Sequence, residues 1–221
     1  MYTKHQWKHE YFYNFGYVRY LPKDLDETKK YPLVVFLHGA GERGEDLELT
    51  CKHGFMKHVR ESGKEYPFIF IAPQCPLKKY WGCYTESLLA FLDDICKELP
   101  VDPDRVYLTG LSMGGTGTWM LAMADPERFA AIAPVCGSGI YWNTGYVSNL
   151  PIMMYHGDCD ETVPIQNSIE MLKSVNKRGG NAQIKICYGV KHNAWDTAYA
   201  GDELVNWLLS HKRTGECELK K

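Results

Sequence analysis

Short, continuous runs of apolar residues recur along the chain, and polar or helical segments separate each run from the next. A run of this kind is typical of a strand buried on both faces, because none of its positions has to face water. The predicted strands cover residues 32–38, 68–72, 105–109, 131–135, 152–156 and 183–187. Their alternation with helical segments predicts a mostly parallel sheet with helices on both faces.

Apolar residues spaced three and four positions apart predict the helices between these strands. The predicted helices cover about residues 47–60, 88–99, 119–123, 165–177 and 204–209. Aromatic and β-branched residues at 11–15 and 17–21 predict a hairpin within an N-terminal region 1–30. Residues 212–221 are polar and predict a tail outside the core.

The length of 221 residues predicts one domain over the whole chain, 1–221, with a sizeable core. No repeat, linker or low-complexity tract divides it. Residues 136–151, between two predicted strands, are too few to form a lid domain. The predicted fold class is therefore a three-layer α/β fold without a lid.

The composition argues against several kinds of partner. The net charge of −2 does not favour binding to nucleic acid or to an anionic membrane. The first ten residues contain no apolar segment typical of a signal peptide, and no run approaches the roughly 20 residues of a membrane span. These features predict a cytoplasmic protein. The eight cysteines lack metal-ligand spacing, which predicts reduced thiols and no metal site.

A Gly-Leu-Ser-Met-Gly motif at residues 110–114 lies between the predicted strand 105–109 and a helical pattern. This strand–turn–helix context is the one that a nucleophile elbow requires, with Ser112 at its tip. Gly110 and Gly114 lack Cβ atoms, so we expect the strand and the helix to approach closely there. A serine hydroxyl becomes a good nucleophile when a base removes its proton, so the motif predicts a base elsewhere in the chain.

Three histidines follow Ser112, and their predicted positions distinguish them. His192 lies in the polar loop between the last strand and the last helix, where a fold with such an elbow places its catalytic base. His156 ends a buried strand just before a glycine, which indicates a structural turn. His211 lies in the last turn of the final helix. We therefore predict His192 as the base, the alternative being an ordinary surface side chain.

The carboxylate that orients this base is expected in the loop 156–164, which contains three acidic residues. Asp160 lies further along the loop, from where it can reach His192. Asp158 is close to the strand end and more typical of a residue that holds a turn. Glu161 is predicted to face solvent. Asp160 is therefore the predicted partner of His192, with Asp158 as the alternative.

Negative charge that develops on a reacting carbonyl oxygen requires backbone N–H donors. Met113, the residue after the nucleophile, is predicted to supply one of them. The glycine-rich loop after strand 32–38 is predicted to supply the other from Ala40, with Gly41 as the second choice. For His38 and Arg43 in the same loop, we favour a bracing role through hydrogen bonds.

Several large side chains lie in loops at the predicted carboxyl ends of the strands. Without a lid, the site is expected to be open, with these loops as its walls. The candidate substrate-binding residues are Gln74, Trp81, Trp142, Tyr146 and Trp195. Packing between the loops is the alternative role for each aromatic ring. Aromatic walls would suit a short or aromatic acyl group on a bulky alcohol such as a sugar.

These motifs together resemble the α/β-hydrolase superfamily. The segments that carry the resemblance are 37–44, 72–74, 102–115 and 156–164, in the order typical of these proteins. The chain is most similar to small bacterial carboxylesterases related to feruloyl and acetylxylan esterases, dienelactone hydrolases and prolyl oligopeptidase-type catalytic domains. The resemblance extends over about residues 30–210 and implies a Ser112–Asp160–His192 triad. Dienelactone hydrolase itself has Cys where this chain has Ser112, so that particular activity is not expected.

The predicted function is that of a serine carboxylesterase acting on short-acyl or hydroxycinnamoyl esters, such as acetyl or feruloyl esters of plant polysaccharide fragments. A serine peptidase or an acyl-thioesterase with the same triad is the alternative, because a fold does not determine the substrate. A non-catalytic ligand receptor on a hydrolase fold is a third hypothesis. The expected partner is a small-molecule ester, with no cofactor, metal, nucleic acid or membrane, and a homodimer is compatible with the sequence.

Overall fold

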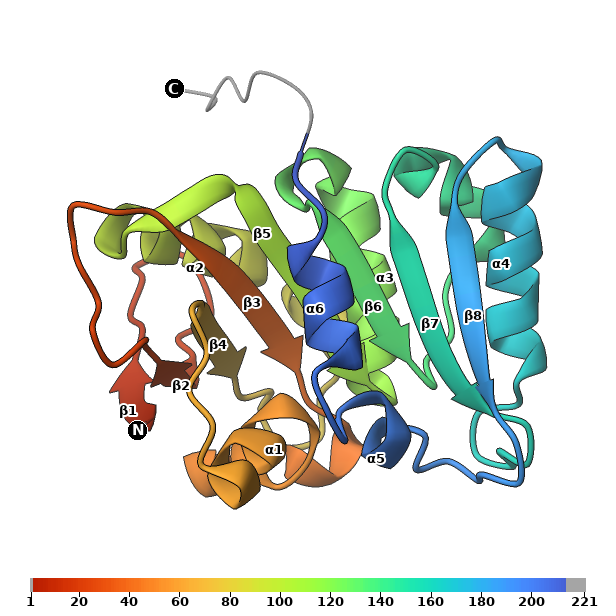
Figure 1. The fold of residues 1–221 in the computed structure, drawn as a ribbon, viewed down its shortest axis with the longest axis horizontal. Helices are drawn as coiled ribbons and strands as arrows, with labels where there is room; N and C mark the ends of the chain where they lie inside the picture. Colours follow the sequence, from red (N-terminus) through yellow and green to blue (C-terminus); the bar gives the residue numbers. More distant parts are fainter. Residues whose placement is uncertain (1, 214–221) are drawn as a thin grey trace.

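A computed structural model describes residues 2–213 and contains an eight-stranded sheet in the order β1-β2-β4-β3-β5-β6-β7-β8 (Figure 1). The strands are β1 (Tyr2–Gln6), β2 (Gly16–Tyr20), β3 (Tyr31–Leu37), β4 (Ile69–Pro73), β5 (Val101–Leu111), β6 (Ala131–Val135), β7 (Ile152–Gly157) and β8 (Ala182–Cys187). Strands β3 to β8 pair in parallel, whereas β1 and β2 add an antiparallel edge. All six predicted parallel strands are confirmed.

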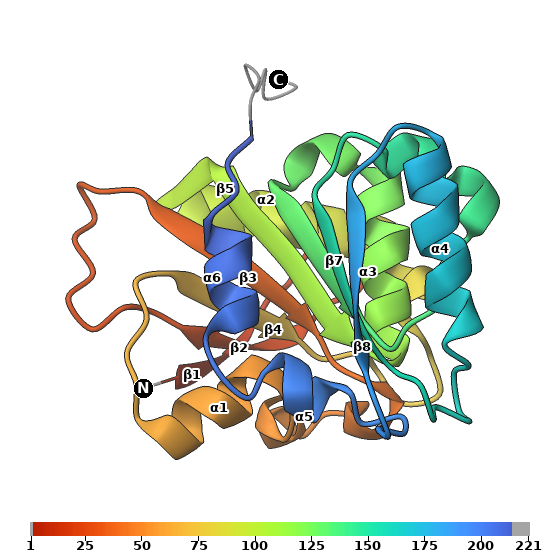
Figure 2. The same cartoon turned by 45° about the vertical axis from the view of Figure 1, so that its right-hand side comes forward.

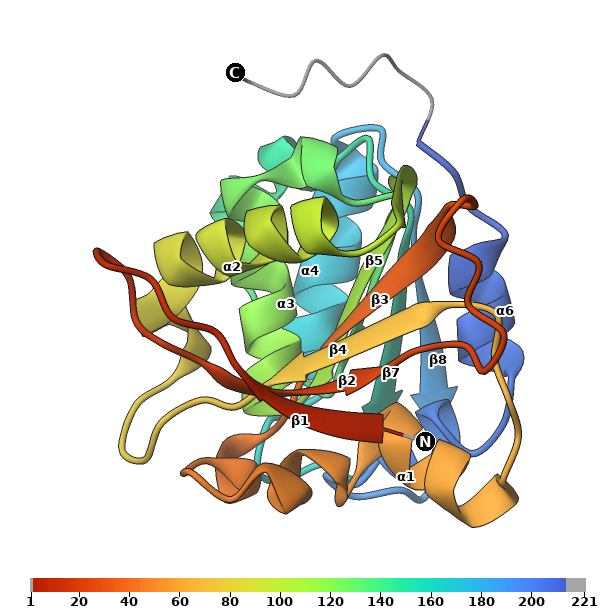
Figure 3. The same cartoon turned by 90° about the vertical axis from the view of Figure 1, so that its left-hand side faces the viewer.

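Helices cover both faces of the sheet, as the apolar runs predicted. The α-helices are α1 (Gly54–Ser62), α2 (Thr85–Glu98), α3 (Met113–Ala124), α4 (Gln166–Lys177), α5 (Trp195–Ala198) and α6 (Glu203–Leu209). The 3-10 helices are η1 (Ala40–Glu42), η2 (Leu47–Cys51), η3 (Trp81–Tyr84), η4 (Pro126–Arg128) and η5 (Tyr141–Val147). Helices α2, α3 and α4 lie on one face, and α1 and α6 lie on the other (Figures 2 and 3).

Strand β3 shows why both faces are apolar. Leu33 and Leu37 point into the core under α2 and α3, whereas Val34 and Phe36 point into the core under α1 and α6. All four are at most 1% exposed. A central strand with this two-sided burial holds the sheet rigidly between two helix layers. Within residues 2–213, no helix is both long and apolar enough to cross a membrane.

Two predicted elements differ from the structure. The predicted first hairpin strand at 11–15 is wrong, because β1 at Tyr2–Gln6 pairs with β2 instead. Phe15 is fully buried in the core, so the aromatic content of 11–15 reflects packing rather than a strand. The predicted helix 47–60 is divided between η2 and α1, because Gly54 has a φ of +71° and a Cβ there would lie 2.4 Å from the Phe36 ring. Most of the predicted polar tail, 214–221, lies outside the described residues.

The connection between β6 and β7 contains no lid. Parallel strands require the chain to return from the carboxyl end of β6 to the amino end of β7. Residues 136–151 make this return through η5, which packs beside α4 in the helix layer (Figure 2). The segment therefore serves as a crossover, in the place where a βαβ unit normally has a helix.

Among the glycines of residues 2–213, the one with the least room for a Cβ atom lies where α3 begins. A Cβ atom on Gly114 would lie 1.8 Å from the carbonyl oxygen of Leu37 and 2.7 Å from that of His38. A Cβ atom on Gly110 would lie 2.5 Å from the Gly114 carbonyl oxygen. All three neighbours are backbone carbonyl oxygens, which cannot rotate away as a side chain could. The expected close approach of strand and helix is therefore present, and it brings α3 against the end of β3.

We expect Gly114→Ala to lower the free energy of unfolding by at least about 3 kcal/mol, because the added methyl group overlaps a backbone carbonyl. Gly201→Ala is the matched control, since nothing lies within 4 Å of a Cβ at that position. Its effect should stay within about 0.5 kcal/mol. Urea unfolding of both variants measures the difference, and equal stabilities would contradict the packing described for Gly114.

Candidate active site

Ser112 occupies a strained turn between β5 and α3. Its backbone has φ +54° and ψ −117°, a region that residues other than glycine rarely adopt. The Ser112 N–H donates to the Val135 carbonyl oxygen at 2.9 Å, which fixes the turn to the end of β6. The turn thus places the hydroxyl at the carboxyl edge of the sheet, where ligands bind in open α/β folds.

His192 reaches this hydroxyl from the loop between β8 and α5. Its Nε2 lies 2.8 Å from Ser112 Oγ, within hydrogen-bond distance. Its other ring nitrogen, Nδ1, lies 2.7 Å from Asp160 Oδ2. Because an ionised carboxylate only accepts, Nδ1 carries the proton and Nε2 is free to accept from the serine hydroxyl. The structure therefore brings the three predicted residues into one hydrogen-bonded chain.

Asp160 is fully buried at the side chain and hydrogen-bonded on both oxygens. Oδ2 accepts from His192, and Oδ1 accepts from the backbone N–H groups of Thr162 and Val163, both at 2.9 Å. Burial raises the pKa of the Asp160 carboxyl, but these hydrogen bonds outweigh that effect, so its pKa lies below the usual value. The carboxylate is therefore held in its charged form beside the imidazole.

A second histidine lies against the same carboxylate. His156 is fully buried, and its Nε2 lies 2.8 Å from the Val163 carbonyl oxygen and 3.3 Å from Asp160 Oδ2. Since both neighbours accept, Nε2 carries the proton, and Nδ1 accepts from the Ser168 hydroxyl at 2.7 Å. The sequence indicated a structural turn at His156, but not that its N–H would face the carboxylate beside His192.

Asp158, the alternative to Asp160, has a different partner. Its Oδ1 accepts from the Gly189 N–H at 2.6 Å, which ties the loop after β7 to the loop after β8. The expected hydrogen bond within its own turn is replaced by this contact between loops. Glu161 is exposed, as predicted. Asp158 therefore supports the two loops that present Asp160 and His192.

His38 and Arg43 hold the loop after β3 by hydrogen bonds, which is the role predicted for them. The Cys75 N–H donates to His38 Nε2 at 2.9 Å, so the proton lies on Nδ1, which donates to the Gly39 carbonyl oxygen at 2.6 Å. Arg43 Nε donates to the Ala40 carbonyl oxygen at 2.8 Å. Each carbonyl shares a peptide plane with the next N–H, so these bonds fix the directions of the Ala40 and Gly41 amides.

The amides predicted to form an oxyanion hole lie at the starts of two helical turns. Ala40 and Gly41 open η1, and Met113 opens α3. The first N–H groups of a helix have no partner within it, so they can bind a ligand oxygen. Burial lowers the pKa of the His38 imidazole to about 4, so this brace stays neutral and does not introduce charge beside the loop.

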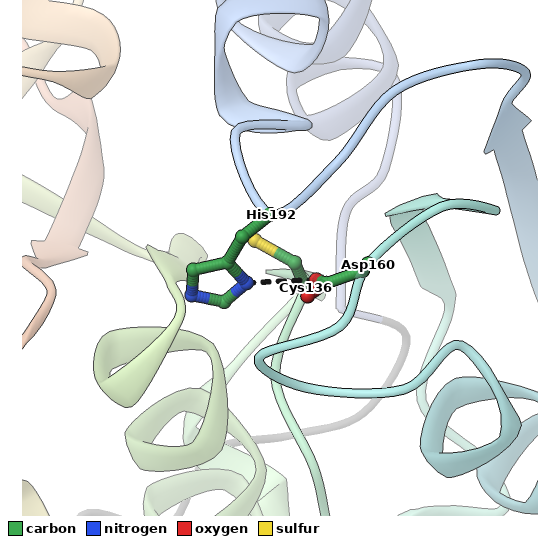
Figure 4. Close-up of side chains that lie close together, drawn as sticks. All are labelled: Cys136, Asp160 and His192. Carbon is green, nitrogen blue, oxygen red and sulfur yellow. Dashed lines mark hydrogen bonds and ion pairs between the residues drawn. The ribbon is translucent and has the colours of Figure 1, made fainter.

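Cys136 is a further buried group at the site that the sequence did not single out. Figure 4 shows its thiol beside Asp160 and His192, and one ligand atom from each lies within 4.8 Å of the other two. Burial raises the pKa of the Cys136 thiol to about 12, so it is protonated at neutral pH. The His192 nitrogen that faces the group already holds a proton for Asp160. This donor set therefore fits a hydrogen-bonded triad better than a metal site.

Two predicted wall residues are buried behind the site. Trp81 is 1% exposed, and its indole N–H donates to the His38 carbonyl oxygen at 2.9 Å. Gln74 is 3% exposed, and its amide donates to the carbonyl oxygens of Glu42 and Asp46, both at 2.8 Å. The prediction that they contact substrate is wrong, because both side chains are buried and their N–H groups donate to the backbone of the 38–46 loop. Gln74 Oε1 is buried without a partner among the described residues. Both side chains support that loop from beneath.

The predictions for Trp142 and Tyr146 are also wrong. Both belong to η5, in the crossover that runs back along α4. The Trp142 carbonyl oxygen accepts from Arg178, just beyond the carboxyl end of α4. That end of α4 lies beside the amino ends of β7 and β8, away from the end of β5 that leads to Ser112 (Figure 1). The two aromatic side chains are 64% and 66% exposed there. A loop that follows a strand was assumed to stay at its carboxyl end, whereas a parallel connection has to leave it.

Trp195 is the predicted wall residue that lies at the site. Its ring meets the His192 ring edge to face, with 5.2 Å between centroids. The Trp195 ring also neighbours the His53 ring, with 5.6 Å between the two centroids. His53 Nε2 in turn lies 3.8 Å from a carboxylate oxygen of Glu42, in η1. No sequence pattern indicated that His53, from the segment before α1, would join this group.

Comparison with known proteins places this geometry in context. Residues 85–200, about half of the chain, match the model of the dienelactone hydrolase family. "Probable feruloyl esterase C" of Aspergillus terreus is 27% identical over 172 residues, which cover 74% of this chain and 62% of that protein. The "Bifunctional acetylxylan esterase/xylanase XynS20E" of Neocallimastix patriciarum is 29% identical over 118 residues, or 52% and 18% of the two chains.

A solved structure is also similar. The crystal structure of a thermostable esterase superposes with a TM-score of 0.85 and is 33% identical, covering 96% of this chain and 63% of that one. The chain thus spans less than two thirds of the length of these relatives.

The buried His38 predicts a pH-dependent stability. The pKa of His38 is about 4 in the folded protein and about 6.5 when it is unfolded, so the unfolded state binds more protons between these values. The stability from neutral His38 is present above pH ~6.5 and falls by up to roughly 3 kcal/mol towards pH ~4. His38→Asn should remove this component, so that its stability deficit narrows as the pH falls. Urea unfolding between pH 4 and 7.5 measures the deficit, and a constant deficit contradicts the assignment.

Proposed function

The chain belongs to the dienelactone hydrolase family, and from this premise we propose that it is a serine carboxylesterase. The observation that carries the proposal is the continuous hydrogen-bonded chain from Ser112 through His192 to Asp160. These hydrogen bonds connect a nucleophile, a base and an orienting carboxylate in the order that acyl transfer requires. The strained turn that holds the hydroxyl at the sheet edge supports the same role.

The mechanism follows from these positions. Ser112 Oγ attacks the ester carbonyl carbon while His192 Nε2 takes its proton. The resulting oxyanion accepts hydrogen bonds from the N–H groups of Met113 and of Ala40, with Gly41 as the alternative second donor. His192 then gives its proton to the leaving alcohol oxygen as the C–O bond breaks, which leaves an acyl-enzyme. Water repeats both steps, which releases the acid and restores Ser112.

Asp160 orients the base in this scheme. Its hydrogen bond to Nδ1 selects the tautomer whose Nε2 can accept the serine proton, and its charge stabilises the imidazolium that forms. The two backbone amides on Oδ1 and the N–H of His156 keep the carboxylate weakly basic. A weakly basic carboxylate leaves the Nδ1 proton on His192, so the imidazolium gives up its Nε2 proton, which passes to the leaving alcohol oxygen.

The proposed substrates are esters with short or hydroxycinnamoyl acyl groups, such as acetyl or feruloyl esters of plant polysaccharide fragments. The names of two relatives, a feruloyl esterase and an acetylxylan esterase, support this class. No lid interrupts the connection between β6 and β7 in residues 2–213, which supports a site open to a bulky alcohol. The proposed location of the protein is the cytoplasm.

We expect Ser112→Ala to lower the hydrolysis of p-nitrophenyl acetate by more than roughly 10³-fold while the protein stays folded, because no other group replaces the nucleophile. A fluorophosphonate probe should label the wild type and not the variant. Retained turnover in Ser112→Ala would reject the mechanism. Absence of both turnover and labelling in the wild type would favour a ligand receptor.

The same assay defines the substrate class. Wild-type protein should cleave p-nitrophenyl acetate and methyl ferulate with a higher kcat/KM than an acyl thioester or an aminoacyl anilide. A preference for the anilide would assign a peptidase, and a preference for the thioester would assign a thioesterase, in both cases with the same triad.

Two aspartates in one loop provide a matched test of the orienting carboxylate. Asp160→Asn should lower kcat by about 10³–10⁴-fold, because an amide favours the wrong imidazole tautomer. Asp158→Asn should lower kcat much less, since Asp158 bonds Gly189 rather than His192. Steady-state kinetics on p-nitrophenyl acetate separate the two, and similar losses in both variants would contradict the assignment of Asp160.

A further inference from the structure

We propose that His156, held by Ser168 of α4, is a positioning residue that acts through Asp160 and limits how firmly His192 holds its proton. The inference rests on the proposed esterase function and adds a residue to its machinery. The contacts that carry it continue the catalytic chain beyond the carboxylate. They run from Ser112 through His192, Asp160 and His156 to Ser168.

One oxygen of Asp160 faces both imidazole rings. Oδ2 lies 2.7 Å from His192 Nδ1 and 3.3 Å from His156 Nε2, whereas Oδ1 accepts from two backbone N–H groups. The side chains of Asp160 and His156 are both 0% exposed. Bulk water therefore does not screen the contact between them, and the N–H dipole of His156 acts at full strength on the oxygen that orients His192.

The His156 ring has a fixed orientation. Its Nε2–H donates to the Val163 carbonyl oxygen at 2.8 Å, on the side of the ring that also faces Asp160 Oδ2. Its Nδ1 accepts from the Ser168 hydroxyl at 2.7 Å, and Ser168 is itself 2% exposed, in the first turn of α4. A flipped ring would leave Val163 and Ser168 without this partner, which is unfavourable in a buried place. The N–H therefore stays directed at the loop that carries the carboxylate.

The approach of this N–H to Oδ2 assigns His156 a role in the reaction. Its hydrogen bond to the Val163 carbonyl ties the loop to β7 but does not affect the base. Oδ2, by contrast, stabilises the imidazolium that His192 becomes when it takes the proton of Ser112. The partial positive charge of a second N–H beside Oδ2 weakens that stabilisation, so His192 gives its Nε2 proton more readily to the leaving alcohol.

A pH profile reports on this chain because the groups around it are neutral or the same in every variant. Cys136, after β6, places its thiol beside the catalytic carboxylate and imidazole, and Cys187 ends β8. Burial raises the pKa of both thiols, that of Cys136 to about 12, so both are neutral near pH 7. The facing groups of α4 and α5 are the uncharged Ser168 hydroxyl and Trp195 ring. The exposed neighbours in sequence, which no variant alters, are Asp158, Cys159, Glu161 and Lys191.

The test measures the pH dependence of p-nitrophenyl acetate hydrolysis. The ratio of kcat/KM at pH 8 to that at pH 6 reports where His192 takes up a proton, and each rate is expressed per folded molecule from circular dichroism at the same pH. His156→Leu removes the ring N–H at similar volume, so its ratio should be about threefold larger than that of the wild type. His156→Gln places an amide N–H near the position of Nε2 and should restore the wild-type ratio.

A second variant serves if His156→Leu does not fold. Ser168→Ala leaves the His156 ring in place but removes the partner of its Nδ1, so the N–H is directed less strictly at Asp160. Its ratio should be about twofold larger than that of the wild type. Thr109→Val is the control, because it removes a buried hydroxyl that bonds the Ala133 carbonyl oxygen and Tyr199, away from the carboxylate. Its ratio should equal that of the wild type.

The outcomes separate a role in the reaction from a role in stability alone. A wild-type ratio in His156→Leu or in Ser168→Ala overturns the proposal, as does an equal increase in His156→Gln or in Thr109→Val, which would assign the effect to packing. In each of these cases the wild type still hydrolyses the ester, so the proposed function stays intact. If the wild type hydrolyses the ester at neither pH, the proposed function itself fails.

Discussion

The candidate site depends on one backbone contact, the approach of Gly114 to the carbonyl oxygen of Leu37. This contact brings the first turn of α3 against the end of β3. Ser112 precedes that turn and the loop with Ala40 follows β3, so the contact makes the two adjacent. Main-chain atoms set their separation, which side-chain motion cannot change. The positive φ of Ser112 is the strain that accompanies this arrangement, and the pairing of β5 with β3 and β6 maintains it.

Around this contact, most polar groups of the site have a defined partner that orients them. His38 holds the Gly39 carbonyl, Arg43 holds the Ala40 carbonyl, and Asp160 receives hydrogen bonds on both oxygens. In the proposed mechanism, such preorganisation would leave little reorganisation of the site to accompany the reaction.

The sequence was sufficient to predict the repeating strand–helix pattern and the residues whose place is set by the end of a strand. The six parallel strands were predictable because central strands are apolar on both faces, and Asp160 and His192 were placed together because each follows a neighbouring strand. Features set by distant contacts were not predictable. From the sequence, Trp81 is one loop aromatic among several. Its burial depends on the hydrogen bond from its indole N–H to the His38 carbonyl oxygen, which the sequence does not reveal. The contact of His53 with Trp195 likewise joins segments far apart in the sequence.

The crossover between β6 and β7 also decides where new sequence could be accommodated. Residues 136–140 leave the catalytic edge, whereas η5 packs beside α4, and Trp142 is exposed there. Extra residues inserted near Gly137 would emerge over Ser112 and could evolve into a cap. The same insertion near Gly145 would emerge at the opposite rim and leave access to the nucleophile unchanged. A fusion partner or surface linker is therefore best grafted at Gly145.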